Sequence, residues 1–284
     1  MKAEMLSSKS IVAAFKLEIQ EKNQLSSQKG YVPTLTAIIV GEDGPSMAYA
    51  LSKEKSCKNL GINFSLKAFD ANISQEMLIG EIQKLNRDQN VHGIMLELPL
   101  PKGIDGYKVT SAIDPQKDVD GVTPVNRGLL LMGKLNEALL PVTPLSCITL
   151  IESANADISG KSIAVVGRGE TVGLPLAVLL IKRSATVTVC HSKTKDLREI
   201  LKSSDIVVAA TGHAGLIKPD MLTHGQIVID AGITVLPGGS IVGDVDPLAA
   251  EIVSYLTPVP GGVGALTVML IIKNLFKAMS IQGK

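Results

Sequence analysis

The stretch that decides the fold is residues 162–173, which read SIAVVGRGETVG. Its apolar beginning predicts a buried β-strand, and the apolar segment 174–182 after it predicts a helix. The turn between them has a G-x-G-x-x-x-G spacing, one residue longer than the usual dinucleotide fingerprint, formed by Gly167, Gly169 and Gly173. A glycine turn alone serves many strand–helix connections. Because this one opens a helix, whose N–H groups and dipole can hold a pyrophosphate, it favours nucleotide binding.

The end of the next predicted strand, 186–190, bears on which nicotinamide cofactor binds. It is followed by His191-Ser192-Lys193-Thr194-Lys195, which contains no carboxylate. An NAD enzyme usually offers Asp or Glu there to the ribose hydroxyls. The cationic sequence therefore favours the 2′-phosphate of NADP, held near Ser192 with Arg168 as a second cation. A solvated basic loop is the alternative interpretation.

Strand and helix patterns alternate on both sides of this turn. The predicted strands are 35–40, 64–69, 93–98, 162–166, 186–190, 206–209, 227–229 and, more weakly, 241–245. The predicted helices are one capped by Ser7 or Ser8 and those at 46–59, 74–87, 145–154, 174–182, 196–201 and 266–279. This alternation predicts an α/β fold with parallel, doubly wound sheets. Prolines recurring between residues 99 and 144 indicate the passage to a second domain.

Composition narrows the class of protein. The 28 basic and 27 acidic residues give a net charge of +1, so the basic surplus of a nucleic-acid binder is absent. The longest apolar run, 263–272, is about half of the roughly 20 residues that a membrane span needs. Residues 1–20 lack the apolar stretch of a signal peptide. Three cysteines, widely separated, indicate neither disulfides nor a metal cluster: Cys57, Cys147 and Cys190. We expect a cytoplasmic protein without nucleic-acid, membrane or metal partners.

Further candidate residues precede the glycine turn. Tyr49 and Lys53 are four residues apart and share one face of a predicted helix, with Cys57 a turn further on. A phenol beside an ammonium can orient a substrate and move protons, although such pairs are also common on surfaces. In short-chain dehydrogenases a Tyr-x-x-x-Lys pair follows the nucleotide-binding turn, whereas here it comes first, which argues against that family.

Three other segments carry unusual polar residues. Glu97 lies at the carboxyl end of a buried strand, where ligands of α/β proteins bind. Asp118 and Asp120 lie together in a loop. The stretch 257–264, TPVPGGVG, is a stiff, glycine-rich loop that enters the last helix, although a domain linker would read similarly.

Together these segments resemble the methylenetetrahydrofolate dehydrogenase/methenyltetrahydrofolate cyclohydrolase family. The similar motifs run in family order from about residue 35 to 270. They are Ser46-x-x-Tyr49-x-x-x-Lys53-x-x-x-Cys57 with Gly61-Ile62, Leu98-Pro99-Leu100-Pro101, Lys117-Asp118-Val119-Asp120-Gly121, Thr143-Pro144-Leu145, Val165-Val166-Gly167-Arg168, Cys190-His191-Ser192-Lys193-Thr194, Asp230-Ala231-Gly232-Ile233, Gly243-Asp244-Val245 and Thr257 to Gly264.

The resemblance implies a folate-binding catalytic domain, residues 1–140 plus 265–284, and a Rossmann-like NADP-binding domain, residues 141–264, with the cleft between them. It also implies that the protein is a homodimer and that it acts in one-carbon metabolism and purine biosynthesis. Such an enzyme oxidises methylenetetrahydrofolate to methenyltetrahydrofolate by hydride transfer to NADP, and hydrolyses that product to formyltetrahydrofolate.

The resemblance also implies residue roles. Lys53 would be the general acid and base, Tyr49 would stack on and orient the folate, and Asp120 would hydrogen-bond the pterin ring. The folate site would also be lined by Leu98, Pro260, Gly261, Gly262, Val263 and Gly264. The cofactor would be held by Gly167, Arg168, Gly169, Gly173, Ser192 and Ile233.

This sequence departs from the family at several positions. Glu97 stands beside the catalytic lysine where the family has Gln. A carboxylate favours the ammonium form of a nearby lysine, whereas hydrolysis needs the free amine as a base. We therefore predict a dehydrogenase with an impaired cyclohydrolase step. The other departures are Gly169 for Ser, Ala265 for Pro, and Ser7-Ser8-Lys9 for Asp-Gly-Lys.

The departures leave other functions open. The chain could be a dehydrogenase without hydrolase activity, or a non-catalytic paralogue that binds folate or nucleotide. Another two-domain dehydrogenase, of the amino-acid or shikimate type, would leave the segments around Asp120 and Gly261 unexplained. Retention of Tyr49, Lys53 and Asp120 favours the enzyme over the binding protein, because a binder has little need of an acid/base lysine.

Overall fold

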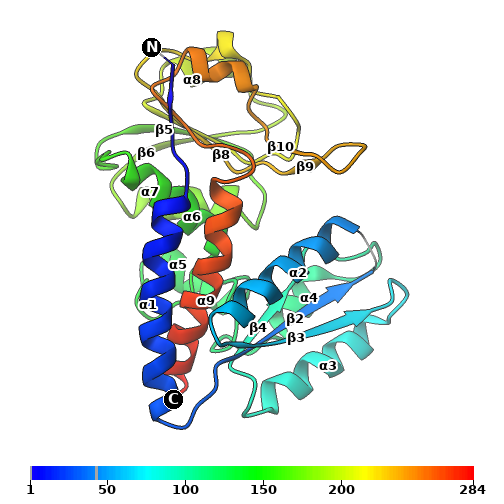
Figure 1. Cartoon of the computed structure of the whole chain (residues 1–284). Coiled ribbons are helices and arrows are strands. Elements are labelled where there is room, and N and C mark those ends of the chain that lie inside the picture. Colours follow the sequence, from blue (N-terminus) through cyan, green and yellow to red (C-terminus); the bar gives the residue numbers. More distant parts are fainter. Residues whose placement is uncertain (1, 42–43) are drawn as a thin grey trace. The chain divides into compact units, whose positions relative to one another are not determined.

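The computed structural model describes residues 2–41 and 44–284, except for the side chains at positions 44–46, 48 and 49. The chain, drawn in Figure 1, divides into two compact units. We call Met1–Val12 with Pro141–Thr267 the six-stranded unit, and Ala13–Leu140 with Val268–Lys284 the three-stranded unit. The sequence-based division, 1–140 plus 265–284 and 141–264, differs mainly in where it puts the first twelve residues.

The six-stranded unit is a parallel α/β structure. Its elements are β1 (Glu4–Met5), α6 (Val142–Ser153), β5 (Ser162–Val166), α7 (Gly173–Ile181), β6 (Thr186–Cys190), α8 (Leu197–Lys202), β7 (Ile206–Ala209), η1 (Pro219–Met221), β8 (Ile227–Asp230), β9 (Thr234–Val235), β10 (Ile241–Val242), η2 (Pro247–Glu251) and β11 (Tyr255–Leu256). Every residue of β7 and β8 is buried, as expected for strands of a sheet covered on both faces. In Figure 1, α6 and α7 lie on one side of this sheet and α8 on the other.

The strand order places the glycine turn at a topological switch point. The order is β1-β11-β8-β7-β5-β6, and every neighbouring pair is parallel. The chain leaves β5 for β6 on one side and later returns to β7 on the other. In such sheets ligands bind where the direction of winding reverses, outside the carboxyl ends of the strands. The turn at 167–173 follows β5 and therefore lies at this position.

Two details of this sheet differ from the sequence-based prediction. The segment 241–245 was expected to supply a strand, but only Ile241–Val242 is extended, and it pairs antiparallel with β9 in a separate two-stranded sheet. Beyond β8 the sheet continues instead with β11 and then β1, each of two residues. Strands this short have no readable alternation, so the sequence could not reveal them.

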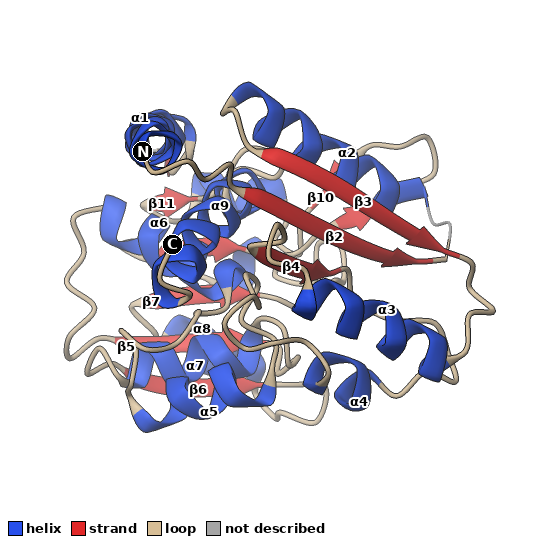
Figure 2. Ribbon diagram, turned by 90° about the horizontal axis from the view of Figure 1, so that it is seen from below, coloured by secondary structure: helices blue, strands red, loops and turns tan. Residues whose placement is uncertain are grey.

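The three-stranded unit has β2 (Thr34–Val40) between β3 (Asn63–Phe69) and β4 (Gly93–Leu96), both parallel to it (Figure 2). Its helices are most of α1 (Lys9–Gln28), α2 (Gly44–Asn59), α3 (Gln75–Arg87), α4 (Gly106–Ser111), α5 (Pro124–Met132) and most of α9 (Val263–Ile281). Figure 1 shows α2 and α3 on opposite sides of the strands. Ser74 caps α3 by accepting a hydrogen bond from Met77 N, which explains where that helix begins.

Helix α9 is long and apolar enough to cross a membrane by length and composition, but 67% of its most apolar window is buried inside the structure. That burial is typical of a core helix. In the three-stranded unit α9 runs beside α1, and Lys273 Nζ lies 2.7 Å from Glu18 Oε2 (Figure 1). The sequence predicted this helix as 266–279, slightly shorter than it is.

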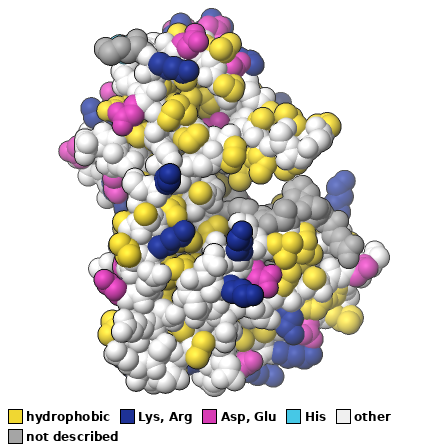
Figure 3. All heavy atoms as spheres, in the orientation of Figure 1, with side chains coloured by type: hydrophobic (Ala, Val, Ile, Leu, Met, Phe, Trp, Pro, Cys, Tyr) yellow, Lys and Arg dark blue, Asp and Glu magenta, His cyan; other side chains and the backbone are white. Residues whose placement is uncertain are grey.

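The β9–β10 hairpin carries exposed apolar side chains. Figure 3 shows hydrophobic side chains gathered over it. Val235, Leu236 and Ile241 are between 37% and 41% exposed. The turn between the strands contains Gly238 and Gly239, both with positive φ, so the strands reverse direction within a few residues.

Candidate active site

The centre of the candidate site in the three-stranded unit is a buried ion pair. Lys53 lies on α2 and is 2% exposed, and its Nζ is 2.5 Å from Glu97 Oε1. Glu97 directly follows β4, and its backbone N donates to the Ile38 carbonyl at the end of the paired region of β2. The lysine therefore does not point into bulk water. A helix and a strand end hold an ammonium and a carboxylate together, as the hypothesis about Glu97 required.

Asp120 belongs to the same charged group. Its pKa is raised to about 7, mainly because burial removes the carboxylate from water, with further contributions from the negative charges of Asp118 and Glu97. The positive charges of Lys53 and Arg127 partly oppose this rise in pKa. A carboxyl group in this setting changes its protonation near neutral pH, and so it can serve either as hydrogen-bond acceptor or as donor toward a ligand.

The loop that carries Asp120 is fixed by its neighbours in the sequence. Asp118 is fully buried, and its carboxylate accepts hydrogen bonds from Val122 N, Thr123 N and Asn126 Nδ2. Lys117 is also buried, and its Nζ donates to the carbonyls of Leu85, Asn86 and Asp88, at the end of α3. The Lys117-Asp118 pair thus supports the loop, whereas Asp120 is the carboxylate placed with Lys53 and Glu97.

A residue that the sequence did not single out also supports this loop. Asn274, on α9, is 7% exposed and donates through Nδ2 to the Val119 carbonyl at 2.8 Å and to the Leu140 carbonyl at 2.9 Å. Arg127, on α5, was likewise missed, although its charge acts on Asp120. For Asn274, the one available signal was its position as a polar residue within an otherwise apolar helix. For Arg127, nothing in the sequence distinguishes it from a surface arginine.

The remaining sequence-predicted residues of this unit divide into three cases. Tyr49 lies on α2, but its side chain is outside the described residues. Leu98 is half-buried and packs against the apolar core beside β4. Cys57 is fully buried, and burial raises the pKa of its thiol to about 12, so it is a packing residue rather than a nucleophile. Among the described residues no group of three or more His, Cys, Asp or Glu side chains is arranged to hold a metal ion.

In the six-stranded unit, the glycine turn has no room for side chains at two of its positions. A Cβ on Gly167, whose φ is +120°, would lie 2.1 Å from the Ala210 carbonyl oxygen. A Cβ on Gly173 would lie 2.1 Å from the Gly167 carbonyl oxygen. At Gly169 a Cβ would meet nothing within 4 Å, and Arg168 beside it is exposed. The N-cap residue of α7, Val172, makes no side-chain cap hydrogen bond in the described structure, and main-chain N–H groups at such a helix end can bind a phosphate.

The loop after β6 follows the neighbouring strand end, because Cys190 pairs with Val166. It is held in a compact turn by hydrogen bonds from His191 N to Thr194 Oγ1 and from Lys193 N to His191 Nδ1. Ser192 is exposed within it. These glycines, the open helix end and the exposed serine between basic residues fit an NADP molecule, with its pyrophosphate on α7 and its 2′-phosphate at the loop after β6.

The glycine-rich loop near the C-terminus belongs to the same unit as far as Thr267. Ser8 N and Ser8 Oγ both donate to the Gly261 carbonyl, at 3.1 Å and 2.8 Å. Ile233 is 53% exposed, and a Cβ on Gly264 would lie 3.8 Å from its Cδ1. Pro260 is exposed, whereas Gly262 and Val263 are buried. The structure thus brings Ile233 and Gly264 together, two residues predicted to hold cofactor and folate.

Two family models match the chain. One is described as tetrahydrofolate dehydrogenase/cyclohydrolase, catalytic domain, and covers residues 6–120. The other is the NAD(P)-binding domain of the same family, and it covers residues 141–283. The first match contains Lys53, Glu97 and Asp120, and the second contains the glycine turn.

Relatives match over the full length. Bifunctional protein FolD 2 of Desulfitobacterium hafniense is 48% identical over 283 residues, which is 99% of each chain. The solved structure of the bifunctional enzyme FolD, methylenetetrahydrofolate dehydrogenase/cyclohydrolase, from Campylobacter jejuni has a TM-score of 0.94 and 39% identity, covering 99% of both chains. That of Trypanosoma brucei FolD, complexed with NADP cofactor and inhibitor, has a TM-score of 0.93 and 35% identity, covering 100% of this chain and 99% of that one. By these matches, and by the site residues that fall within them, the chain belongs to the tetrahydrofolate dehydrogenase/cyclohydrolase family.

Proposed function

We propose that this chain oxidises methylenetetrahydrofolate to methenyltetrahydrofolate with NADP and hydrolyses the product to formyltetrahydrofolate. The observation that carries this proposal is the grouping of Lys53, Glu97 and Asp120 in the three-stranded unit, within a chain whose other unit has an open glycine turn. A protein that only binds its ligands has less need of a lysine paired with a carboxylate in this position than an enzyme that moves protons.

NADP bound at the glycine turn supplies the hydride acceptor for the oxidation. The turn and the loop after β6 bind it through backbone N–H groups, Ser192 and Arg168. In the folate site of the three-stranded unit, Asp120 hydrogen-bonds the pterin, and Tyr49 and Leu98 orient it. Positioning of this kind is the main contribution that a protein makes to hydride transfer.

Lys53 is the acid/base group of the hydrolysis. As a free amine it takes a proton from the water that attacks the methenyl carbon. As an ammonium it returns a proton to the folate nitrogen when the C–N bond breaks. Glu97 Oε1, 2.5 Å away, holds Lys53 Nζ in an ion pair, from which the lysine must be released before it can act on water. The hydrolysis is therefore slower than it would be with a neutral amide at position 97.

The broader biological setting follows from the family resemblance. The chain works as a homodimer in the cytoplasm, and its formyltetrahydrofolate serves purine biosynthesis. The near-neutral charge and the mostly buried α9 support a protein that binds neither nucleic acid nor membrane. Sedimentation analysis tests the dimer directly, since a single species with the mass of one chain would contradict it.

Two absorbance assays on one preparation test the proposed function. NADPH formation is followed with methylenetetrahydrofolate, and the disappearance of added methenyltetrahydrofolate is followed without NADP. We expect both reactions with the wild type, and loss of most of the hydrolysis with Lys53→Met. Tight binding of folate and NADP with no turnover of either kind would instead identify a non-catalytic binding protein.

A further inference from the structure

Two buried carboxylates interlock at the carboxyl end of the six-stranded sheet. Asp230, the last residue of β8, is 4% exposed, and Asp244, which follows β10, is fully buried. Asp230 Oδ1 accepts hydrogen bonds from Gly232 N and Asp244 N, both at 3.0 Å, and its Oδ2 accepts one from Val245 N at 2.9 Å. No step of the proposed reaction uses either carboxylate.

Asp244 in turn holds the loop that follows β7. Its Oδ2 accepts hydrogen bonds from Thr211 N at 2.5 Å, Thr211 Oγ1 at 2.9 Å and Gly212 N at 3.1 Å. Hydrogen bonds to a charged acceptor are stronger than those between neutral groups. A single buried oxygen thus fixes two consecutive residues of a loop that has no regular structure of its own.

Two glycines are required for the carboxylates to approach so closely. A Cβ on Gly232 would lie 2.2 Å from Asp244 Cγ, and a Cβ on Gly243 would lie 1.9 Å from Asp230 Oδ2. Every other residue type would push a carboxylate out of place. The glycines therefore belong to the same arrangement as the two aspartates.

The loops held by this pair border the nucleotide site. The carbonyl oxygen of Ala210, just before Thr211, lies only 2.1 Å from the position that a Cβ on Gly167 would take. The loop after β7 therefore packs directly against the glycine turn. On the other side, the Asp230–Gly232 hydrogen bond fixes the turn that leads into Ile233. Asp230 N also donates to Thr257 Oγ1 at 2.7 Å, at the start of the loop 257–264.

We propose that Asp230 and Asp244 are positioning residues of the NADP site, which hold the loops after β7 and β8 in the conformation that receives the cofactor. This inference rests on the proposed function. The two carboxylates accept hydrogen bonds from main-chain N–H groups and from Thr211 Oγ1, and they act on the cofactor through the placement of residues 210–212 and 231–233. Their contribution is to NADP affinity, and the acid/base group of the other unit does not depend on it.

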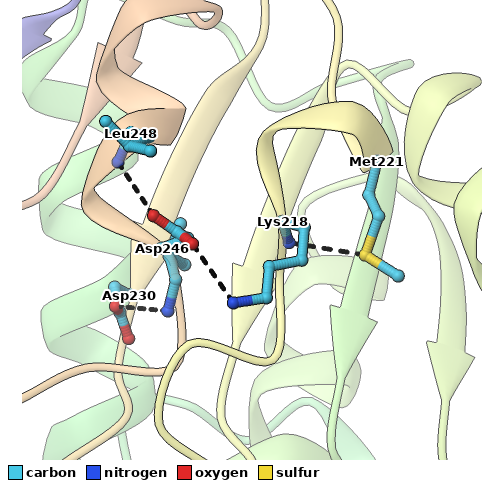
Figure 4. A network of polar contacts seen from close by, with 6 residues as sticks. Lys218, Met221, Asp230, Asp246 and Leu248 are labelled. Atoms are coloured by element: carbon cyan, nitrogen blue, oxygen red, sulfur yellow. Dashed lines mark hydrogen bonds and ion pairs between the residues drawn. The ribbon is translucent and has the colours of Figure 1, made fainter.

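The chain offers a matched control two residues away. Figure 4 shows Asp246 beside the same network, with its carboxylate accepting from Leu248 N and from Lys218 Nζ, at 3.1 Å each. Its side chain is 22% exposed, and it holds the start of η2 rather than a loop at the glycine turn. Asp246→Asn removes one negative charge from the same region, and Asp246 makes its side-chain contacts with Leu248 and Lys218 rather than with residues 210–213.

The experiment compares Asp244→Asn, Asp246→Asn and wild type by NADP titration calorimetry and, without cofactor, by amide hydrogen exchange of residues 210–213. We expect the NADP Kd to rise about tenfold or more in Asp244→Asn, since about 1.4 kcal/mol corresponds to a factor of ten. Exchange of the β7 loop should accelerate in this variant alone. Hydrolysis of methenyltetrahydrofolate, assayed without NADP, should stay within about twofold of wild type, because its acid/base group lies in the other unit.

Thr211→Val is the milder second variant, for use if Asp244→Asn does not fold. It deletes the hydrogen bond that Thr211 Oγ1 donates to Asp244 and the one that it accepts from His213 N, while both main-chain hydrogen bonds to Asp244 remain. It should raise the NADP Kd by about threefold to tenfold, with faster exchange at residues 211–212. Wild-type NADP affinity and unchanged exchange in the folded variants would overturn the inference. Failure of the wild type itself to bind NADP would contradict the proposed function instead, so the two failures are distinguishable.

Discussion

The three-stranded unit gathers ionisable side chains at its candidate site, whereas the six-stranded unit presents glycines and main-chain groups. In the first, Lys53, Glu97 and Asp120 are close enough for their charges to affect one another. In the second, the carboxylates of Asp230 and Asp244 accept hydrogen bonds from the neighbouring loops. A ligand at the glycine turn therefore meets mainly main-chain groups. A change of charge should therefore damage the first site, and an added methyl group should damage the second.

The largest effect is expected when the ammonium is removed. Lys53→Met should reduce the hydrolysis by about 10²- to 10⁴-fold, the usual contribution of a general acid or base. It also leaves Glu97 without its partner, so Lys53→Met with Glu97→Gln is the control that separates chemistry from a buried, uncompensated charge. Initial rates of both reactions and the thermal midpoint are measured for each variant. Hydrolysis near the wild-type rate in either would remove Lys53 from the mechanism.

A methyl group tests the other unit. Gly173→Ala places a Cβ 2.1 Å from the Gly167 carbonyl, which should cost about 1–3 kcal/mol of unfolding free energy and abolish measurable NADP binding. Gly169→Ala is the matched control, because its Cβ meets nothing within 4 Å and the thermal midpoint should not change. Calorimetric NADP titration and thermal unfolding are the measurements. Equal behaviour of the two variants would show that backbone shape does not define this site.

On the exposed surface of the six-stranded unit, an added charge should affect NADP binding only where a phosphate is expected. Ser192→Asp should weaken NADP binding about tenfold by repulsion of the 2′-phosphate, and should affect NAD binding much less. Ser192→Asn, uncharged and of similar size to Asp, is its control. Kd values for both cofactors are compared at low salt and at 0.5 M salt, about the range over which screening removes exposed charge effects. An NADP affinity unchanged by the aspartate would place the phosphate elsewhere.

Removing the charge of Glu97 tests how the ion pair affects the two reactions differently. Glu97→Gln should accelerate hydrolysis at neutral pH by up to about tenfold, because a neutral amide no longer holds Lys53 in an ion pair. Hydride transfer should change by less than about twofold, since it depends on positioning rather than on a free amine. The ratio of the two rates, measured on one preparation, is the readout. A wild type whose hydrolysis already equals its oxidation, and gains nothing from Gln, would contradict the prediction.

The smallest effect concerns pH. Burial raises the pKa of Asp120 to about 7, so the carboxylate that accepts hydrogen bonds is present mainly above that pH and is lost as the pH falls through it. The KM for methylenetetrahydrofolate should rise about threefold or more between pH 8 and pH 6. In Asp120→Asn this dependence should disappear, although the KM itself is higher throughout. A KM independent of pH in the wild type would assign the pterin contact to another group.

The sequence predicted the secondary structure of the six-stranded unit most accurately around the glycine turn. The strands 162–166, 186–190 and 206–209 have the expected bounds. These are apolar runs flanked by turn residues, so local pattern alone determines them. The sequence-based prediction missed β1 and β11, each of two residues, and it placed β10 in the main sheet, outside which it lies. Pairing over long sequence distances determines these elements.

The candidate site shows the same limit. Lys53, Glu97 and Asp120 were identified from the sequence by motif, but that they form one charged group is a property of the folded unit. Asn274 and the Asp230–Asp244 pair were not identified as site residues. Their roles depend on hydrogen bonds to residues that are distant in the chain, such as Val119 and Thr211.

The amino-acid sequence by itself determined the class of fold, the position of the nucleotide-binding turn and the family motifs, since hydrophobic periodicity and glycine spacing are local properties of the chain. Only the tertiary structure decided that Lys53 is buried against Glu97, that Asp120 titrates near neutral pH, and that two aspartates brace the loops beside the turn. The physical reason is that burial, charge interactions and buried hydrogen bonds depend on which distant residues become neighbours, and a linear sequence does not state this.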